Sequence, residues 1–228
     1  MENSNIPKHV AIIVDGNRRW AKEQGKPTSK GHNEGLKNLK IISEYILSKG
    51  IKYLSLFVFS TENFKRDEKE VKYLMDLFIK AFKKEKNYFL KNNIKVIFSG
   101  RKINLPKEVI ESIEEIEKTT KDCTKGTCNF CLNYGGQSEI IDAVNNIIKD
   151  NKKEITTEDF EKYLYQNLPP IDLMIRTSGE IRISNFMLWQ LAYAELHFTK
   201  TYFPALTKEE IDEILIEFSK RNRRFGKN

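Results

Sequence analysis

The sequence predicts an α/β fold, with a central, mostly parallel sheet of about six strands flanked by helices. Short apolar runs bounded by turn residues recur along the chain, as expected of buried strands in a parallel sheet. Helical patterns lie between these runs, and this alternation is typical of repeated β-α-β units. No linker, repeat or low-complexity segment interrupts the chain, so we expect residues 1–228 to form a single domain.

The individual elements follow from the period of their apolar residues. The expected strands cover residues 9–15, 53–60, 94–100, 128–134 and 171–177, with a weaker one near 195–201. The expected helices cover about 33–49, 68–91, 106–120, 137–150, 185–194 and 208–222. In the helix at 68–91 the apolar residues recur at i, i+3, i+4 and i+7. This stripe suits either the core or the wall of a long hydrophobic pocket, and the sequence leaves both interpretations open.

Composition and charge narrow the class of protein. The chain is 39% hydrophobic and 31% charged, which is typical of a globular protein. It has no apolar stretch of about 18 residues, so no membrane span is expected. Its N-terminus lacks the apolar core of a signal peptide, which favours the cytoplasm. The net charge of +7 comes from lysines interspersed with acids, and this indicates a solvated surface more than an anionic partner or membrane. Basic residues are not clustered with aromatics, so nucleic-acid binding is not expected.

The segment at residues 9–35 carries the strongest functional signal. Its apolar run ends in Asp15, Gly16 and Asn17, and two arginines and a tryptophan follow. Parallel sheets bind ligands at the carboxyl ends of their strands. A carboxylate, an amide and guanidinium groups at such an end indicate a metal-assisted site for a phosphorylated substrate. The Walker A and dinucleotide-binding motifs are both absent, so those routes to nucleotide binding are not expected.

Three further segments place anion-binding side chains directly after expected strands. They are STENFKR at 60–66, NYGG at 133–136 and RTSGEIRISNF at 176–186. Each also has an ordinary interpretation, as a helix cap with a surface ion pair or as a strand-to-helix turn. Glu195 follows an apolar stretch. Alone it is more simply a solvated glutamate, but together with Asp15 it suits a hard-oxygen Mg²⁺ site beside substrate phosphates.

On these motifs the chain resembles the undecaprenyl diphosphate synthase family, the cis-prenyltransferases. The matching segments are HVAIIVDGNRRWA at 9–21, GH at 31–32, FSTENFKR at 59–66, NYGG at 133–136, DLMIRTSGEIRISNFMLWQLAYAEL at 172–196 and RRFG at 223–226. The Asp-Asp metal motif of trans-prenyltransferases does not occur in the chain. The resemblance implies an enzyme that condenses isopentenyl diphosphate in cis with an allylic diphosphate, expected to be farnesyl diphosphate.

The expected product is undecaprenyl diphosphate for the cell-wall carrier lipid. A shorter-chain or irregular isoprenyl diphosphate synthase is an alternative, and a non-catalytic prenyltransferase subunit is a further one. The resemblance also implies a homodimer, a hydrophobic tunnel for the growing chain, Mg²⁺ as cofactor and peripheral membrane contact for release of the product.

Residue roles carry over from the family by matching position. Asp15 is expected to hold Mg²⁺ and assist departure of the diphosphate, and Glu195 to complete the metal site beside residues 224–226 of a second subunit. Asn63, with Ser60, is expected at the proton-removal step. The allylic diphosphate is expected against Gly16, Asn17, Arg19, His32 and Arg66, with Trp20 and Phe64 shaping that site, and the isopentenyl diphosphate against Arg176, Arg182 and Ser184. Further substrate contacts are expected at Arg18, Thr28, Thr61, Glu62 and Ile183.

Two positions depart from the pattern that is common in bacterial long-chain enzymes. Arg18 stands where those enzymes commonly have glycine, and Thr28 where they usually have an arginine for the allylic diphosphate. Arg18, Lys26 or Lys30 supplies the displaced charge in one interpretation. In the other, the allylic site is changed and accepts a different primer or catalyses an irregular condensation.

Overall fold

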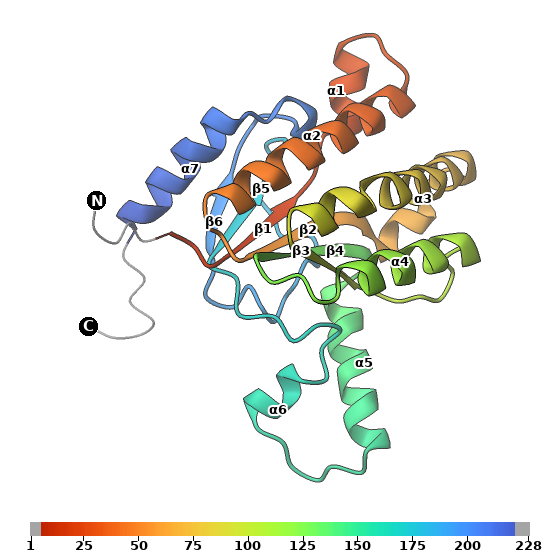
Figure 1. Ribbon diagram of the computed structural model, residues 1–228, viewed down its shortest axis with the longest axis vertical. Coiled ribbons are helices and arrows are strands. Elements are labelled where there is room, and N and C mark those ends of the chain that lie inside the picture. The colour runs from red at the N-terminus through yellow and green to blue at the C-terminus, as the bar shows by residue number, and fades with distance from the viewer. Residues whose placement is uncertain (1–5, 222–228) are drawn as a thin grey trace. The chain divides into compact units, whose positions relative to one another are not determined.

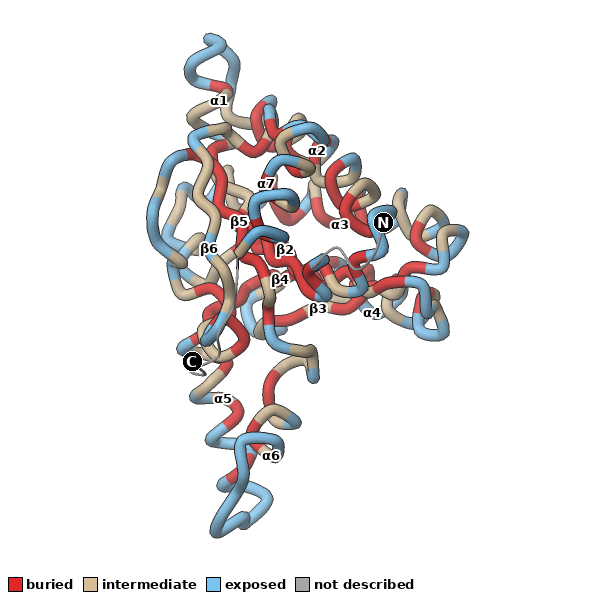
Figure 2. The backbone as a smooth tube through the Cα atoms, turned by 90° about the vertical axis from the view of Figure 1, so that its left-hand side faces the viewer, coloured by how far each residue is buried: buried red, intermediate tan, exposed pale blue. Residues whose placement is uncertain are grey.

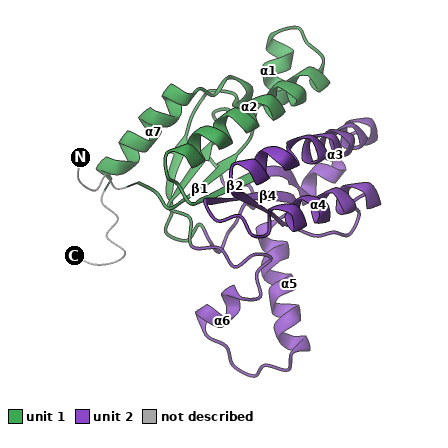
Figure 3. Ribbon diagram, in the orientation of Figure 1, with its two compact units in different colours: residues 1–56, 170–182, 191–228 green, residues 57–169, 183–190 purple. Residues whose placement is uncertain are grey.

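The computed structural model describes residues 6–221, and the chain divides into two compact units (Figure 3). Unit 1 comprises residues 1–56, 170–182 and 191–228, and unit 2 comprises residues 57–169 and 183–190. Strand β2, Tyr53–Ser60, passes from the first unit into the second.

Six strands form the sheet, in the order β3-β4-β2-β1-β5-β6. The pairs β1–β5, β5–β6 and β3–β4 are parallel, which confirms the predicted α/β fold. The strands are largely buried (Figure 2), as expected where helices cover both faces of a parallel sheet. Besides β2, they are β1 His9–Ile13, β3 Ile94–Ser99, β4 Gly126–Tyr134, β5 Leu173–Arg176 and β6 Glu195–Phe198.

Unit 1 places three helices around β1, β5 and β6. They are α1 Asn17–Glu23, α2 Thr28–Ser48 and α7 Lys208–Lys220, and a short 3-10 turn, η2, covers Phe203–Ala205 (Figure 1). The buried Asn38 side chain on α2 donates to the carbonyl oxygens of Phe203 and Leu206, at 2.6 and 2.9 Å. These two bonds fix the turn before α7 to α2, although the Phe203 carbonyl also accepts the Leu206 N–H within the turn.

Unit 2 contains the 3-10 turn η1 and four helices. Their bounds are η1 Thr61–Lys65, α3 Glu68–Lys91, α4 Lys107–Thr120, α5 Gly136–Lys149 and α6 Thr157–Glu161. Helices α3 and α4 lie side by side (Figure 1). Leu74, Phe78 and Phe82 of α3 pack with Val109 and Ile113 of α4 in the core of this unit. Core packing is therefore one role of the apolar stripe at 68–91.

The predicted helix at 185–194 is wrong. The structure has turns there, with positive φ at Ser184, Asn185 and Met187 (49°, 62° and 36°). A right-handed helix cannot contain such residues. The apolar spacing that predicted a helix comes from Met187 and Leu191, which are four residues apart and are buried although the segment is irregular. Helices α1 and α6 are short and were not predicted.

Other predicted bounds shift by a few residues. Helix α2 begins at Thr28 rather than at 33, and β1 ends at Ile13 rather than at 15. Helix α7 ends at Lys220, and residue 222 of the predicted helix lies outside the described residues. Among residues 6–221, no helix combines the length and apolar character needed to cross a membrane.

A two-pronged ion pair fastens α5 to the end of β3 in unit 2. Arg101 donates to both oxygens of Asp142, at 2.8 and 2.7 Å, and the Tyr165 hydroxyl donates to the same carboxylate at 2.5 Å. The Arg101 hydrogen bond lowers the pKa of Asp142, and the Tyr165 bond acts in the same direction. The ionised carboxylate thus stabilises the fold above its ordinary pKa, and this contribution is lost as pH falls through the lowered pKa of the folded state.

We therefore expect Asp142→Asn to destabilise the protein by about 1 kcal/mol at neutral pH, because it removes the charge that both donors face. The difference from the wild type should shrink as pH falls through the folded-state pKa of Asp142. Thermal melts over a pH series measure this, with Asp122→Asn, an exposed position, as control. A difference that stays constant down to the lowest pH would contradict the role of this ion pair.

Candidate active site

Asp15 and Gly16 form the turn that follows β1. The backbone N–H of Asp15 donates to the Thr177 hydroxyl at 3.0 Å, and the Asp15 carboxylate accepts the Gly16 N–H at 2.7 Å. Gly16 has a φ of +101°, and a Cβ at this position would lie 2.6 Å from the Tyr202 ring. Only glycine suits both the conformation and the space. The chain can therefore turn directly behind the carboxylate and enter α1.

Two arginines hold the Asp15 carboxylate. Arg176, the last residue of β5, lies beside Ile13 in the parallel register, and its Nη2 donates to Asp15 Oδ2 at 3.1 Å. Arg19, one turn into α1, approaches the same oxygen at 3.2 Å. The Arg176 side chain is only 5% exposed. Because a buried charge is costly without a partner, Arg176 depends on Asp15 for its stability in this position.

A chain of charged groups extends from this pair into the loop after β5. Arg19 donates to Glu180 at 2.8 Å and to the Ser178 carbonyl at 3.2 Å, and Arg182 donates to the other Glu180 oxygen at 2.6 Å. The Arg182 hydrogen bond lowers the pKa of Glu180, and Arg19 adds to the effect. Arg176 also donates to the Arg182 carbonyl at 2.5 Å. Three arginines face two carboxylates, and this excess of positive charge favours an anionic ligand.

Asn17 opens α1 and packs against two glycines of α2. A Cβ on Gly31 would lie 2.0 Å from the Asn17 carbonyl oxygen, and one on Gly35 would lie 2.3 Å from Asn17 Oδ1. Within the described residues, the buried Oδ1 accepts no hydrogen bond. The close approach of α1 and α2 therefore requires glycine, so Gly31 of the GH motif has a packing role. His32 is buried on the same helix.

The other expected allylic residues of unit 1 lie at the edge of this pair of helices. Arg18 is exposed on α1, and Thr28 is the first residue of α2, directly after Pro27. The Lys26 ammonium lies 4.9 Å from the centre of the Trp20 ring, within the range of a cation–π contact. A cation thus lies two residues before Thr28, held against an aromatic side chain of α1.

In unit 2, Ser60 and Asn63 form a capping box where β2 passes into η1. The Ser60 backbone N–H donates to Asn63 Oδ1 at 3.1 Å, and the Ser60 side chain accepts from the Asn63 backbone. The two residues expected at the proton-removal step are therefore in direct contact, and their side chains are oriented by the backbone without help from a ligand. Thr61 and Glu62 occupy the turn between them.

Asn185 is a residue that the sequence did not single out. Its Oδ1 accepts the Gln137 N–H at 2.8 Å, and its carbonyl oxygen accepts the Gly136 N–H at 2.7 Å. Its Nδ2 donates to Glu62 at 3.1 Å. Burial acts to raise the pKa of Glu62, but hydrogen bonds from its backbone, Asn185 and nearby hydroxyls outweigh burial and lower it. A conformational signal for Asn185 did exist, because asparagine readily adopts positive φ.

Glu139 is buried in the first turn of α5 and binds the segment at 183–190 through Gln190. Its carboxylate accepts from the Tyr134 hydroxyl at 2.5 Å, the Tyr165 N–H at 3.1 Å and Gln190 Nε2 at 3.2 Å. Burial raises the pKa of Glu139, although these donors act against the rise. The Gln190 bond thereby fixes the segment at 183–190 to α5. Tyr134 of the NYGG motif donates to the same carboxylate, so it has a structural role.

A groove of about 660 Å³ lies along α3 in unit 2. Half of its lining is apolar, namely Phe64 of η1, Val71, Met75 and Ile79 of α3, and Pro106. The other half is polar or charged, namely Glu68, Lys72, Asp76, Asn104 and Glu108. Phe64 also packs edge-on against Phe59 of the core, at 5.0 Å between ring centres. The structure thus shows core packing by the α3 stripe and a surface groove along the same helix, and the long hydrophobic pocket stays a prediction. Beside the groove's η1 end, Arg66 pairs with Glu70 at 3.3 Å.

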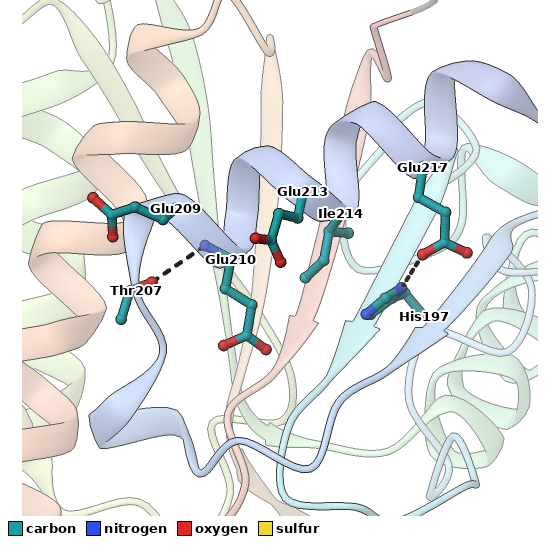
Figure 4. A pocket seen from close by; sticks show the side chains of 7 residues that line it. All are labelled: His197, Thr207, Glu209, Glu210, Glu213, Ile214 and Glu217. Atoms are coloured by element: carbon teal, nitrogen blue, oxygen red, sulfur yellow. Dashed lines mark hydrogen bonds and ion pairs between the residues drawn. The ribbon is translucent and has the colours of Figure 1, made fainter.

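A second groove, of about 360 Å³, lies between β6 and α7 in unit 1 (Figure 4). Four glutamates line it, together with His197, Thr207 and Ile214; they are Glu209, Glu210, Glu213 and Glu217. His197 Nδ1 contacts Glu217 at 3.1 Å. No predicted substrate residue lines this groove, and its carboxylates would repel a diphosphate. It is therefore not the predicted site.

Glu195 does not join Asp15 within one chain. The register pairs Glu195 with Leu173 at the amino end of β5, and Leu173 with Val10 of β1. The carboxyl end of β1 at Ile13 is about 10 Å further along the strands, and Asp15 lies beyond it. Glu195 instead accepts from Arg221 at 2.9 Å. Residues 224–226, expected beside it from a second subunit, lie outside the described residues. Within residues 6–221, no group of three or more acidic, histidine or cysteine side chains could hold a metal ion.

Each unit, taken by itself, offers one kind of binding chemistry. In unit 1, a carboxylate within a basic cluster at the ends of parallel strands suits a diphosphate and a divalent cation. In unit 2, the apolar side chains of the groove along α3 suit a hydrocarbon chain. An enzyme that transfers isoprenyl groups needs both kinds of chemistry.

The chain belongs to the undecaprenyl diphosphate synthase family of prenyltransferases, whose model matches residues 13–226. It is 52% identical to an isoprenyl transferase of Fusobacterium nucleatum, over 97% of this chain and 96% of the relative. It is 45% identical to a tritrans,polycis-undecaprenyl-diphosphate synthase (geranylgeranyl-diphosphate specific) of Thermococcus kodakarensis, over 100% and 89% of the two chains.

A solved structure extends the likeness to the fold. The lavandulyl diphosphate synthase of Lavandula x intermedia, crystallised with dimethylallyl diphosphate, matches with a TM-score of 0.94 and 31% identity, over 99% of this chain and 100% of the other. The protein is accordingly an enzyme, a cis-prenyltransferase, and this confirms the predicted reaction class.

We expect Asp15→Asn to lower kcat at least about 100-fold, because it removes the carboxylate charge next to the expected diphosphate site. The amide keeps the size of the side chain and an oxygen for Gly16 and Arg176, so the protein should still fold, with a lower melting temperature because the buried Arg176 loses its counter-charge. Steady-state rates measure the first effect, and circular dichroism with thermal melts measures the second. Asp122→Asn makes the same chemical change at an exposed position and should leave kcat unaltered. A near-normal rate of Asp15→Asn with Mg²⁺ would contradict the catalytic role of Asp15.

Proposed function

We propose that this enzyme condenses isopentenyl diphosphate with farnesyl diphosphate to give undecaprenyl diphosphate for the cell-wall carrier lipid. The observation that carries the proposal is the Asp15 carboxylate, held between Arg19 and the buried Arg176 at the carboxyl ends of β1 and β5. The expected substrates share a diphosphate group, and an excess of guanidinium groups beside one carboxylate suits that group together with a divalent cation.

The arginines stabilise the leaving diphosphate. Breaking the allylic C–O bond places negative charge on the departing oxygen, and donors oriented in advance stabilise such charge without reorganising. Arg176 is held by Asp15 and by the Arg182 carbonyl, so its orientation is set before substrate arrives. By analogy with other oxyanion donors, each such group contributes about 3–4 kcal/mol to the transition state. We assign Arg176, Arg182 and Ser184 to the isopentenyl diphosphate, and Arg19 to the allylic diphosphate.

Mg²⁺ fits the donor set at Asp15. This cation is commonly held by one or two carboxylates together with substrate phosphates and water, so a single aspartate next to a diphosphate site suffices. When bound, Mg²⁺ supplies additional stabilisation of the charge on the leaving group. Asp15 would hold the cation in this proposal. The strand register keeps Glu195 away from Asp15 of the same chain. In this proposal Glu195 would therefore contribute only to the site of a second subunit.

Asn63 and Ser60 act at proton removal in this proposal. An amide is not basic, so Asn63 orients the group that accepts the proton rather than accepting it. The capping box supports this role, because it fixes Asn63 Oδ1 on the Ser60 N–H and leaves the amide nitrogen for another partner. Thr61, Glu62 and Phe64 lie on the same turn, η1, and are the proposed contacts of the allylic substrate there.

The groove along α3 is the proposed binding surface for the isoprenoid chain. Its apolar side chains match a hydrocarbon, and each buried methylene group contributes about 0.8 kcal/mol. An apolar wall also keeps water away from the allylic cation. We further propose a homodimer with a closed tunnel, and peripheral membrane contact during release of the lipid product.

Labelled isopentenyl diphosphate tests the proposed function directly. We expect Mg²⁺-dependent elongation of farnesyl diphosphate to a C55 product, abolished by EDTA and restored by Mg²⁺. Parallel reactions contain dimethylallyl or geranylgeranyl diphosphate, since one similar protein is specific for geranylgeranyl diphosphate and another was crystallised with dimethylallyl diphosphate. Chromatography of the products separates the outcomes. A shorter, branched or geranylgeranyl-primed product would replace the proposed substrate or product and leave the reaction class intact.

We expect Thr28→Arg to lower the KM for farnesyl diphosphate about fivefold, because it restores a guanidinium at the start of α2, where relatives use one for the allylic diphosphate. Thr157→Arg makes the same change at the exposed first residue of α6 and should leave this KM unchanged. An unchanged or higher KM for Thr28→Arg would indicate that Lys26, held against Trp20, already supplies the missing charge.

A further inference from the structure

The segment that follows Arg182 has an unfavourable backbone conformation. Ser184, Asn185 and Met187 have φ values of 49°, 62° and 36°, in the left-handed region that residues other than glycine rarely adopt. Surrounding contacts must hold such a segment in place, and backbone strain of this kind is characteristic of functional sites. The contacts of Asn185 therefore indicate what this conformation is for.

Asn185 uses its carbonyl oxygen and both polar ends of its side chain to join two other segments of unit 2. Its carbonyl oxygen and Oδ1 accept the N–H groups of Gly136 and Gln137 at the start of α5, and its Nδ2 donates to Glu62 of η1. The amide orientation is settled by its partners, since an N–H must face the oxygen and a carboxylate must face the nitrogen. A Cβ on Gly135 would lie 2.8 Å from this nitrogen, so no larger residue fits beside it.

Each end of the Asn185–Glu62 bond is adjacent to a residue with a proposed role. Asn185 follows Ser184, which we assign to the isopentenyl diphosphate, and Glu62 precedes Asn63, which we assign to proton removal. We propose that Asn185 is a positioning residue whose hydrogen bond to Glu62 sets the distance between Ser184 and Asn63. This inference rests on the proposed function, because it uses the roles given there to those two residues.

A purely structural role for Asn185 would be to cap α5. Capping requires only the side-chain oxygen, and a negative charge at a helix N-terminus is favourable. Asn185→Asp retains that oxygen and adds the charge, so a capping role predicts equal or higher stability and normal activity. The positioning role predicts the opposite for activity, because the substitution replaces the donor to Glu62 with an oxygen that repels it.

The experiment is a double-mutant cycle of Asn185→Asp and Glu62→Gln in the full-length protein. Asn185→Asp should raise the KM for isopentenyl diphosphate and lower kcat, reducing kcat/KM at least about tenfold, with the melting temperature within about 2 °C of wild type. Combining it with Glu62→Gln lets the new amide donate to the new carboxylate. The hydrogen bond then returns with its polarity reversed, and kcat/KM should recover at least about fivefold relative to Asn185→Asp alone.

Asn145→Asp, at an exposed position on α5, is the control for the added charge and should behave as wild type. Normal activity of Asn185→Asp, or a double variant no more active than Asn185→Asp, would overturn the inference. The wild-type protein in the same assay tests the proposed function separately. If wild type does not elongate any primer, the proposed function fails. If wild type is active and the cycle shows no coupling, only the role of Asn185 fails.

Discussion

The ion pair between Asp15 and Arg176 is the interaction on which the rest of the site in unit 1 depends. It joins the ends of two adjacent parallel strands, and it neutralises a guanidinium that is almost removed from water. Neither residue could be replaced by a neutral one without leaving the other charge poorly compensated. Asp15 is already paired with two arginines. When a cation and a diphosphate bind together, Asp15 can pair with the cation and the arginines with the diphosphate, so no charge is left isolated.

In unit 2, the polar side chains of the site lie on turns, and hydrogen bonds to the backbone hold them in place. The capping box of Ser60 and Asn63, the buried carboxyl of Glu139 and the amide of Asn185 all satisfy backbone groups at places where a strand or helix ends. Such groups would otherwise lack partners, so the same bonds that stabilise the turns also orient the side chains. Rigid elements thereby carry the site, although its residues lie on loops.

The sequence was sufficient for the fold class and for most buried elements, because apolar periodicity reflects burial directly. It also located the polar segments at strand ends, since Asp15 and Arg176 each stand next to an apolar run. It failed at 185–194, where buried Met187 and Leu191, four residues apart, imitate a helical stripe although the backbone is left-handed nearby. The sequence also could not show that Glu195 and Asp15 lie apart within one chain, because their separation depends on strand register, and register is a property of tertiary pairing.

The register of β1 against β5 has a consequence for how this sequence can change over evolution. Side chains alternate between the two faces of a sheet, so sliding β5 by one residue would turn Arg176 to the opposite face. The ladder of backbone hydrogen bonds and the apolar character of the strand would survive such a slip almost unchanged. A single-residue deletion between residues 171 and 175 would thus turn Arg176 away from Asp15. Substitutions within this strand are more easily tolerated than any change in its length.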